Sequence, residues 1–183
     1  MKNTENTSTK QTRQSLTLST KSNTINSMKH RVWDLNQDYD TLVKWWNQWE
    51  FGVVPKECLP PDGIVVEVDG VPVCAGGLYI GVGTQFAFME WIVADKEQNT
   101  RILHQALTLC IDQIMDLAKA KGMRLVYTAT KEESLHKRYV KYHRMHLTES
   151  NVKTFLRDFE GSYSKDLEWI QDEEQYEKQT NNE

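Results

Sequence analysis

The stretch from residue 85 to residue 122, QFAFMEWIVADKEQNTRILHQALTLCIDQIMDLAKAKG, most constrains how this chain can fold. Residues 85–94 are apolar on both faces of a two-residue period, which predicts a central strand covered on both sides. The rest of the stretch places apolar side chains at helical spacing, and Gly122 ends that repeat. A buried strand that leads into a helix N-terminus favours anion binding, because free backbone N–H groups point outward there.

Glu90 is the only charged residue within the predicted strand. It shares one face with Phe86, Phe88 and Ile92 by the two-residue period. A carboxylate among apolar neighbours costs free energy unless it is paired or lies where water and substrate enter. Glu90 is therefore expected either to pair with a neighbouring cation or to lie where water and substrate enter.

The sequence offers two candidate starting points, within one turn of each other, for the long helix. Asp95 and Gln98 have the spacing of a capping box, and Asn99 is a second candidate cap. An earlier helix, expected from Asp38 as its cap to about residue 50, holds a tryptophan cluster. The cluster fits either a core or the wall of a ligand pocket, and its members are Trp45, Trp46 and Trp49.

The remaining pattern completes a sheet with helices on both faces. Residues 30–35 predict a first strand, and residues 63–68 and 71–80 predict a hairpin around Asp69-Gly70. Residues 124–129 predict another strand, and Thr130 to Glu133 have the form of a capping box for a helix to about residue 144. Residues 146–159 are expected to be mostly extended. This order of elements predicts an α/β fold with a mixed sheet.

The composition predicts one domain with two polar tails. Residues 1–28 are rich in Ser, Thr, Asn, Gln and Lys, which predicts a disordered basic arm, either a solubilising leader or a segment that orders on a partner. Residues 29–159 form the domain, and residues 160–183 form an acidic tail with a short helix. The net charge of −4 gives no argument for a nucleic-acid partner, and no apolar run reaches the length of a membrane span.

The cysteines and histidines predict a reducing compartment and no metal site. The three cysteines have neither zinc-like spacing nor the even count of a disulfide framework. Three histidines, His136, His143 and His146, lie near a predicted helix end without a nearby cysteine. We therefore expect no bound metal.

Three segments, in order, resemble the GCN5-related N-acetyltransferase (GNAT) superfamily, and most resemble the short GNAT-like proteins of tailed bacteriophages. The first is DYDTLVKWWNQW followed by PPDGIVVEVDGVPVCAGGLYI. The second is FMEWIVADKEQNTRILHQALTLCIDQIMDLAKAKGMRLVYTAT, and the third is SLHKRYVKYHRMHLTES. The resemblance implies a GNAT-like, mostly antiparallel sheet with a splay between residues 85–94 and 124–129. It also implies a phage-encoded protein located in the host cytoplasm or in the virion.

The resemblance further implies acetyl-CoA as co-substrate and acetyl transfer to an unknown small-molecule or protein amine. The pantetheine arm would pair with backbone groups of the strand, namely Trp91, Ile92 and Val93. The pyrophosphate would lie on N–H groups that open the long helix, namely Gln98, Asn99, Thr100 and Arg101. Glu90 would be the base, and Tyr142, which matches the superfamily's helical tyrosine, would protonate the leaving thiolate.

The pyrophosphate loop departs from the superfamily's pattern. Gln98 fits, but Arg101 stands where the pattern has glycine, and Leu103 stands where it has glycine or alanine. Glycine permits close approach of backbone to phosphate, whereas an arginine either donates to the phosphates or narrows their seat. Two functions therefore stay open: an N-acetyltransferase, and a non-catalytic GNAT-fold virion or interaction protein that uses its N-terminal arm.

Overall fold

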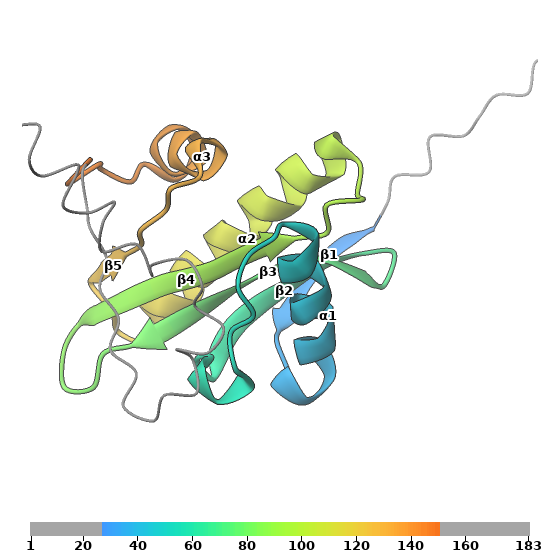
Figure 1. Ribbon diagram of the computed structural model, residues 1–183. Helices are drawn as coiled ribbons and strands as arrows, with labels where there is room; N and C mark the ends of the chain where they lie inside the picture. The colour runs from blue at the N-terminus through green and yellow to red at the C-terminus, as the bar shows by residue number, and fades with distance from the viewer. Residues whose placement is uncertain (1–26, 151–183) are drawn as a thin grey trace, which may run out of the picture. The chain divides into compact units, whose positions relative to one another are not determined.

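The computed structural model of the protein describes residues 27–150. Its centre is a five-stranded sheet with the order β1-β2-β3-β4-β5 (Figure 1). The strands are β1 (Met28–Val32), β2 (Asp62–Val68), β3 (Val71–Ile80), β4 (Phe86–Ala94) and β5 (Leu125–Tyr127). Neighbouring strands from β1 to β4 pair antiparallel, and β5 pairs parallel with β4. The predicted mixed, mostly antiparallel sheet is therefore confirmed.

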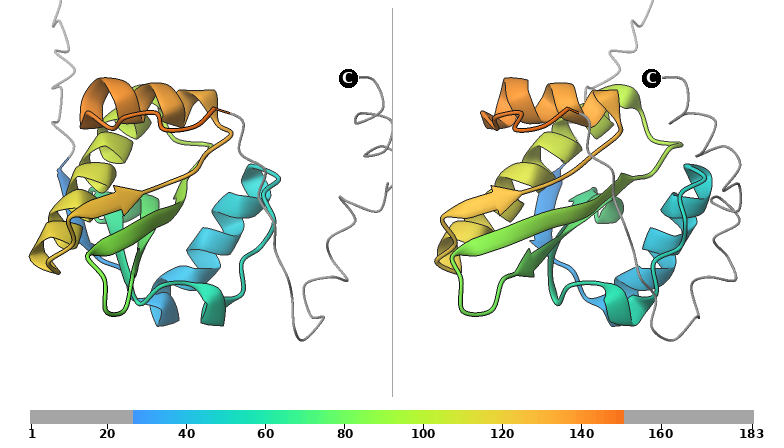
Figure 2. Two further views of the ribbon diagram at one scale, coloured as in Figure 1. Left: turned by 90° about the vertical axis from the view of Figure 1, so that its left-hand side faces the viewer. Right: turned by 60° about the vertical axis from the view of Figure 1, so that its left-hand side comes forward.

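Helices cover both faces of this sheet, as Figure 2 shows. The helices are α1 (Leu35–Gln48), the short η1 (Lys56–Cys58), α2 (Thr100–Ala120) and α3 (Glu133–His143). Ala75 of β3 packs in one cluster with Leu42 and Trp45 of α1. The next residue, Gly76, faces Ile114 of α2. Because successive strand residues point to opposite faces, α1 and α2 lie on opposite sides of the sheet.

Two of the predicted helix starts are wrong. Asp34, not Asp38, caps α1, because its carboxylate accepts from the N–H of Asn36 at 2.9 Å. Helix α3 begins at Glu133 with no side-chain cap, so the predicted capping box from Thr130 does not form. For α2 the structure selects Asn99, one of the two candidate caps, whose side chain accepts from the N–H of Arg101.

Asp38 has a different task, which is to fasten α1 to the edge of the sheet. It is 5% exposed and accepts from the N–H of Asp34 at 2.7 Å. The Arg31 guanidinium of β1 donates to both carboxylate oxygens of Asp38 at 2.7 Å and also to Glu67 of β2. Burial raises the pKa of Asp38, but the hydrogen bonds from Arg31 and Asp34 outweigh it and leave the pKa lowered.

The bounds of the first strand follow from this arrangement. β1 ends at Val32 rather than residue 35, because Trp33 turns into the core and Asp34 starts the helix. The chain divides into two units after Arg144, and residues 145–150, the described part of the second, contain no helix or strand. The predicted N-terminal arm up to residue 26, the extended segment beyond residue 150 and the acidic tail lie outside the described residues. Within residues 27–150, none of the helices has the length and apolar character needed to cross a lipid bilayer.

We expect Asp38→Asn to lower the free energy of unfolding by about 2 kcal/mol at neutral pH, because the charged hydrogen bonds of Arg31 lose their strongest acceptor. The folded-state pKa of Asp38 is lowered, so this contribution is complete above about pH 4 and is lost as the pH falls further. Urea unfolding at neutral pH and at a pH below about 4 measures this contribution. The matched control is Asp40→Asn, an exposed acid on the same helix, and an equal loss there would contradict the prediction.

Candidate active site

The candidate site lies where β4 and β5 part. The two strands pair only from Phe86 to Phe88 on β4 and from Leu125 to Tyr127 on β5. Beyond Phe88, β4 continues to Ala94, and among the described residues no strand pairs with it on that side. In Figure 2 the chain after β5 leaves the line of β4 and leads to α3. The predicted splay between these strands is present.

A bulge in β4 lies at the edge of this splay. Gly77 and Ala75 of β3 pair with Glu90 and Val93, so two residues of β4 stand opposite Gly76 alone. One of them, Trp91, has a φ of 61°, which a bulky side chain rarely adopts. Its indole donates to the Tyr79 hydroxyl at 2.8 Å, so the ring is fixed in place. Tertiary packing therefore holds a strained backbone at this point of the strand.

The absence of a side chain at Gly76 makes room for the bulge. A Cβ at this position would collide with the side chains of Ile92 and of Ile114 on α2. On the other face, the Trp91 ring meets Trp46 edge-on, with the centroids 6.4 Å apart. The bulge is thus held from both faces of the sheet.

The ladder next to the bulge determines which backbone groups face the splay. The N–H of Asp95 donates to the carbonyl of Val73 on β3 at 2.9 Å. Backbone groups alternate sides along an antiparallel strand, so those of Val93 also face β3, whereas those of Ala94 and Ile92 face the splay. The carbonyl of Ala94 already accepts from the Trp49 indole at 2.8 Å. Of Trp91, Ile92 and Val93, this geometry favours Ile92 as the residue that pairs with a ligand.

Glu90 lies at the fork of the two strands. Its Oε1 accepts from the N–H of Ala129, just after β5, at 3.4 Å. Burial raises the pKa of Glu90 to about 7, although hydrogen bonds from the backbones of Ala129 and Trp91 act in the opposite direction. Within residues 27–150, no lysine, arginine or histidine forms an ion pair with it. A carboxyl with this pKa can accept a proton near neutral pH.

Two tyrosines of α3 occupy different surroundings. Tyr142, the motif match, is 44% exposed and packs edge-on against His104 of α2. Tyr139 is 6% exposed. Burial is the main reason that the pKa of Tyr139 is raised to about 12; a hydrogen bond with Thr128 lowers it, and the charge of Glu90 raises it. Helical spacing places both tyrosines on one side of the helix. The superfamily motif matches Tyr142, so the motif gave no reason to select Tyr139.

The N-terminus of α2 has lost two of its donors to internal contacts. Asn99 accepts from the N–H of Arg101 at 2.9 Å, and Gln98 accepts from the N–H of Asn99 at 3.2 Å. Within the part of the chain that the structure describes, the N–H groups of Thr100 and Ile102 have no acceptor. The Arg101 side chain is exposed and makes no hydrogen bond there. These free donors and the guanidinium are the groups of this helix end that could hold an anion.

The end of α1 holds the loop before α2. The Gln48 side chain accepts from the N–H of Lys96 and donates to Asp95, both at 3.1 Å. The Lys96 ammonium donates to the Gln48 carbonyl at 3.0 Å and lies 5.0 Å from the ring centre of Trp49. Trp45 and Trp46, each 2% exposed, are core residues, whereas Trp49, at 38%, forms part of the surface beside the loop. Two members of the tryptophan cluster therefore belong to the core, and the wall of a ligand pocket stays a prediction for Trp49.

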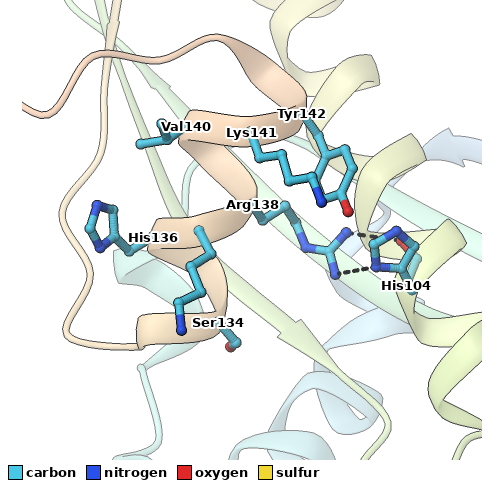
Figure 3. Close-up of a pocket in the computed structure, with 8 residues that line it drawn as sticks. His104, Ser134, His136, Arg138, Val140, Lys141 and Tyr142 are labelled. Carbon is cyan, nitrogen blue, oxygen red and sulfur yellow. Dashed lines mark hydrogen bonds between the residues drawn. The ribbon is translucent and has the colours of Figure 1, made fainter.

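A groove of about 550 Å³ lies between α2 and α3 (Figure 3). Arg138 reaches across it and donates to the His104 carbonyl at 2.9 Å and to the Thr108 hydroxyl at 2.7 Å. The groove is lined mainly by basic and polar side chains, namely His104, Ser134, His136, Lys137, Arg138, Val140, Lys141 and Tyr142. The sequence offers only the cluster of basic residues on α3 as a signal for this groove. Within residues 27–150, no group of three or more His, Cys, Asp and Glu residues could hold a metal ion.

No family model matches the sequence, and no curated protein matches it. Solved structures do match. One is a probable acetyltransferase of unknown function from methicillin-resistant Staphylococcus aureus, with 13% identity and a TM-score of 0.54 over 72% of this chain and all of that one. Another is an aminoglycoside acetyltransferase from an uncultured soil metagenomic sample, in complex with sisomicin, with 13% identity and a TM-score of 0.56 over 71% of this chain and 95% of that one.

A third match is a Mycobacterium tuberculosis protein in complex with CoA, with 15% identity and a TM-score of 0.50. It covers 61% of this chain and 70% of that one. Identities this low carry information on the fold alone. The matched part of the chain therefore has the fold of GCN5-related N-acetyltransferases.

Proposed function

We propose that the protein is an acetyl-CoA-dependent N-acetyltransferase. The observation that carries this proposal is the meeting of three features at one fork: the unpaired edge of β4, the free N-terminus of α2 and the half-buried carboxyl of Glu90. Solved acetyltransferases share the fold that brings these features together. The proposed acceptor is an amine, whose proton a base of this pKa could accept near neutral pH.

The residues present fit acetyl-CoA in three places. Thr100 and Ile102 offer free N–H groups to a pyrophosphate, and Ile92 offers its backbone groups to an extended amide chain. The basic groove between α2 and α3 suits the negatively charged nucleotide end, with Lys137 and Lys141 both exposed. Because Arg101 is exposed and unbonded within the described residues, its guanidinium replaces a glycine contact with a charged donor.

Two residues transfer protons in the proposed reaction: one accepts the proton of the amine, and the other protonates the leaving thiolate. Acetyl-CoA supplies an activated acetyl thioester. Glu90 accepts the proton of the amine at Oε, since about half of its carboxyl groups are ionised near pH 7. Tyr139 keeps its hydroxyl proton at neutral pH, because its pKa is about 12, and can donate that proton to a leaving thiolate. Tyr142 is the alternative donor by its place in the superfamily motif.

An aromatic row leads to Glu90 along the same face of the sheet. Phe86 and Phe88 precede Glu90 at two-residue spacing on β4. The Tyr127 ring of β5 stacks on Phe88 with the centroids 5.2 Å apart and lies 6.3 Å from Phe86. Aromatic faces attract cations and pack against flat apolar groups. This row favours an acceptor amine carried on an apolar or aromatic body.

A second candidate function rests on the phosphate loop. Arg101 and Leu103 stand in place of the small residues that let the backbone approach phosphate closely. This departure favours a non-catalytic GNAT-fold protein that contacts a partner through residues 1–28. Such a protein would be phage-encoded and would act in the host cytoplasm or as a virion component. Absence of acetyl-CoA binding would select it over the enzyme.

Acetyl-CoA should bind the full-length protein with micromolar affinity and raise its melting temperature, because it binds only the folded state. Arg101→Glu should weaken binding by tenfold or more, about 1.4 kcal/mol, by reversing the charge at the phosphate seat. Arg101→Gly should also weaken it, since the exposed guanidinium does not block the seat. Calorimetry measures all three proteins. The control is Arg124→Glu, an exposed arginine before β5, and a folded wild type that does not bind millimolar acetyl-CoA would contradict the proposal.

Glu90→Gln should lower turnover by about 10²–10⁴-fold and remove a rise in wild-type turnover centred near pH 7. The same substitution lowers turnover but should raise the free energy of unfolding. The folded-state pKa of Glu90 is raised, so wild type loses stability as the pH rises from the unfolded value of about 4.3 through about 7, and the glutamine variant should unfold at higher urea above that range. Glu97→Gln, an exposed acid in the following loop, is the control. Full turnover in Glu90→Gln, with only stability changed, would make Glu90 structural.

Tyr139→Phe should lower turnover more than Tyr142→Phe, because the buried Tyr139 hydroxyl lies within the electrostatic influence of Glu90. Each variant removes one hydroxyl, so steady-state kinetics on the two variants compares the contributions of the two hydroxyl groups to turnover. Melting temperatures check that both remain folded. The reverse order of effects would return the role of acid to Tyr142.

A further inference from the structure

A buried histidine joins the last turn of α3 to α2. The His143 side chain is 1% exposed, and its Nδ1 lies 3.0 Å from Oδ1 of Asp112 on α2. An ionised carboxylate can only accept a hydrogen bond, so Nδ1 must carry the proton. In the neutral ring, Nε2 is then a bare lone pair. This nitrogen is also buried and has no hydrogen-bond partner within residues 27–150.

Protonation of this imidazole is unfavourable in the docked helix. A second proton on Nε2 would create a buried N–H without an acceptor. Two charged groups face the ring: Asp112 from α2 and Arg138 from α3 itself. Burial lowers the pKa of His143, the hydrogen bond and charge of Asp112 raise it, Arg138 lowers it, and the net result is a lowered pKa. Acid therefore favours a state in which the ring is exposed to water.

Polar contacts of this kind make up much of the attachment of α3 to α2. From Glu133 to His143, Tyr139 is the one residue of α3 that is buried as a whole, and the side chain of His143 is buried beside it. The other polar anchor is Arg138, which donates to the His104 carbonyl and the Thr108 hydroxyl on α2. Figure 3 shows that Arg138 reaches from α3 to His104, in the wall of the groove. The same contacts that dock α3 thus also shape the groove.

We propose that the His143–Asp112 contact is a pH-sensitive latch, which docks α3 on α2 at neutral pH and releases it in acid. Releasing α3 would dismantle the groove and move Tyr139 away from Glu90. The effect on acetyl-CoA rests on the proposed function, whereas the docking itself does not. Because the pKa of His143 is lowered from the free value of about 6.5, docking is strongest above that pH and weakens below it, by at most tenfold per pH unit.

Hydrogen exchange of the full-length protein tests the latch without any ligand. Protection factors of α3 amides, which already correct for the intrinsic effect of pH, should fall several-fold in wild type between neutral pH and about pH 5.5, relative to amides of β3. His143→Gln should abolish this pH dependence. Asp112→Asn removes the group that favours the charged ring, so its α3 protection should fall over a wider acid range.

The matched control is His30→Gln on β1, the same substitution at an exposed histidine far along the sheet from α3. It should retain the wild-type loss of α3 protection in acid. Wild-type α3 protection that does not change with pH would overturn the latch. So would an equal acid loss in His143→Gln, because another group would then be titrating.

Acetyl-CoA affinity, measured by calorimetry over the same pH range, tests the effect on the groove. The latch predicts weaker binding in acid for wild type and a smaller change for His143→Gln. Affinity that rises in acid would overturn this part, because release of α3 removes the basic wall of the groove. Acid loss of α3 protection in a protein that never binds acetyl-CoA would support the latch and refute the proposed enzyme.

Discussion

The bulge at Trp91 is the constraint on which the candidate site depends. One extra residue in β4 changes which backbone groups face β3 and which face the splay. The positive φ of Trp91 costs conformational free energy, and Tyr79, Trp46 and the space at Gly76 together hold it. Without the bulge, a regular ladder would continue, and β4 would present a different set of groups to the fork.

The two sides of the fork are supported in different ways. On the α1 side, Gln48 and Trp49 hold the loop that leads into α2, through contacts with Lys96 and Asp95. On the α3 side, two polar anchors on α2 carry much of the attachment. The well-packed helix α1 therefore holds the loop that leads into α2, whereas α3, which is less buried, forms the other wall. Under the proposed function, this combination would allow α3 to move while the N-terminus of α2 stays in place.

Periodicity and turn residues were enough to predict the sheet and its helices, whereas the splay between β4 and β5 was predicted through the resemblance to the GNAT superfamily. The errors lie where a distant residue decides a local structure. Asp38 has the type and position of a helix cap, but Arg31 from β1 draws it into the first turn, and Asp34 caps instead. The bulge could not be predicted, because its positive φ falls on tryptophan rather than glycine. Tyr139 and Tyr142 share a helical side, and only packing against α2 and β5 separates their surroundings.

The hydrogen bond from Trp49 to the carbonyl of Ala94 has a consequence for the length of any ligand that the fork accepts. With that carbonyl occupied and Val93 turned toward β3, Ile92 is the residue near the bulge whose backbone groups face the splay. The free N–H groups of Thr100 and Ile102 form the second anchor. A molecule held at both ends must span the gap between them, and that gap is set by main chain rather than by side chains. Under the proposed function, the distance between these two main-chain anchors would determine which acyl carriers fit, through the spacing between their phosphate and their amide.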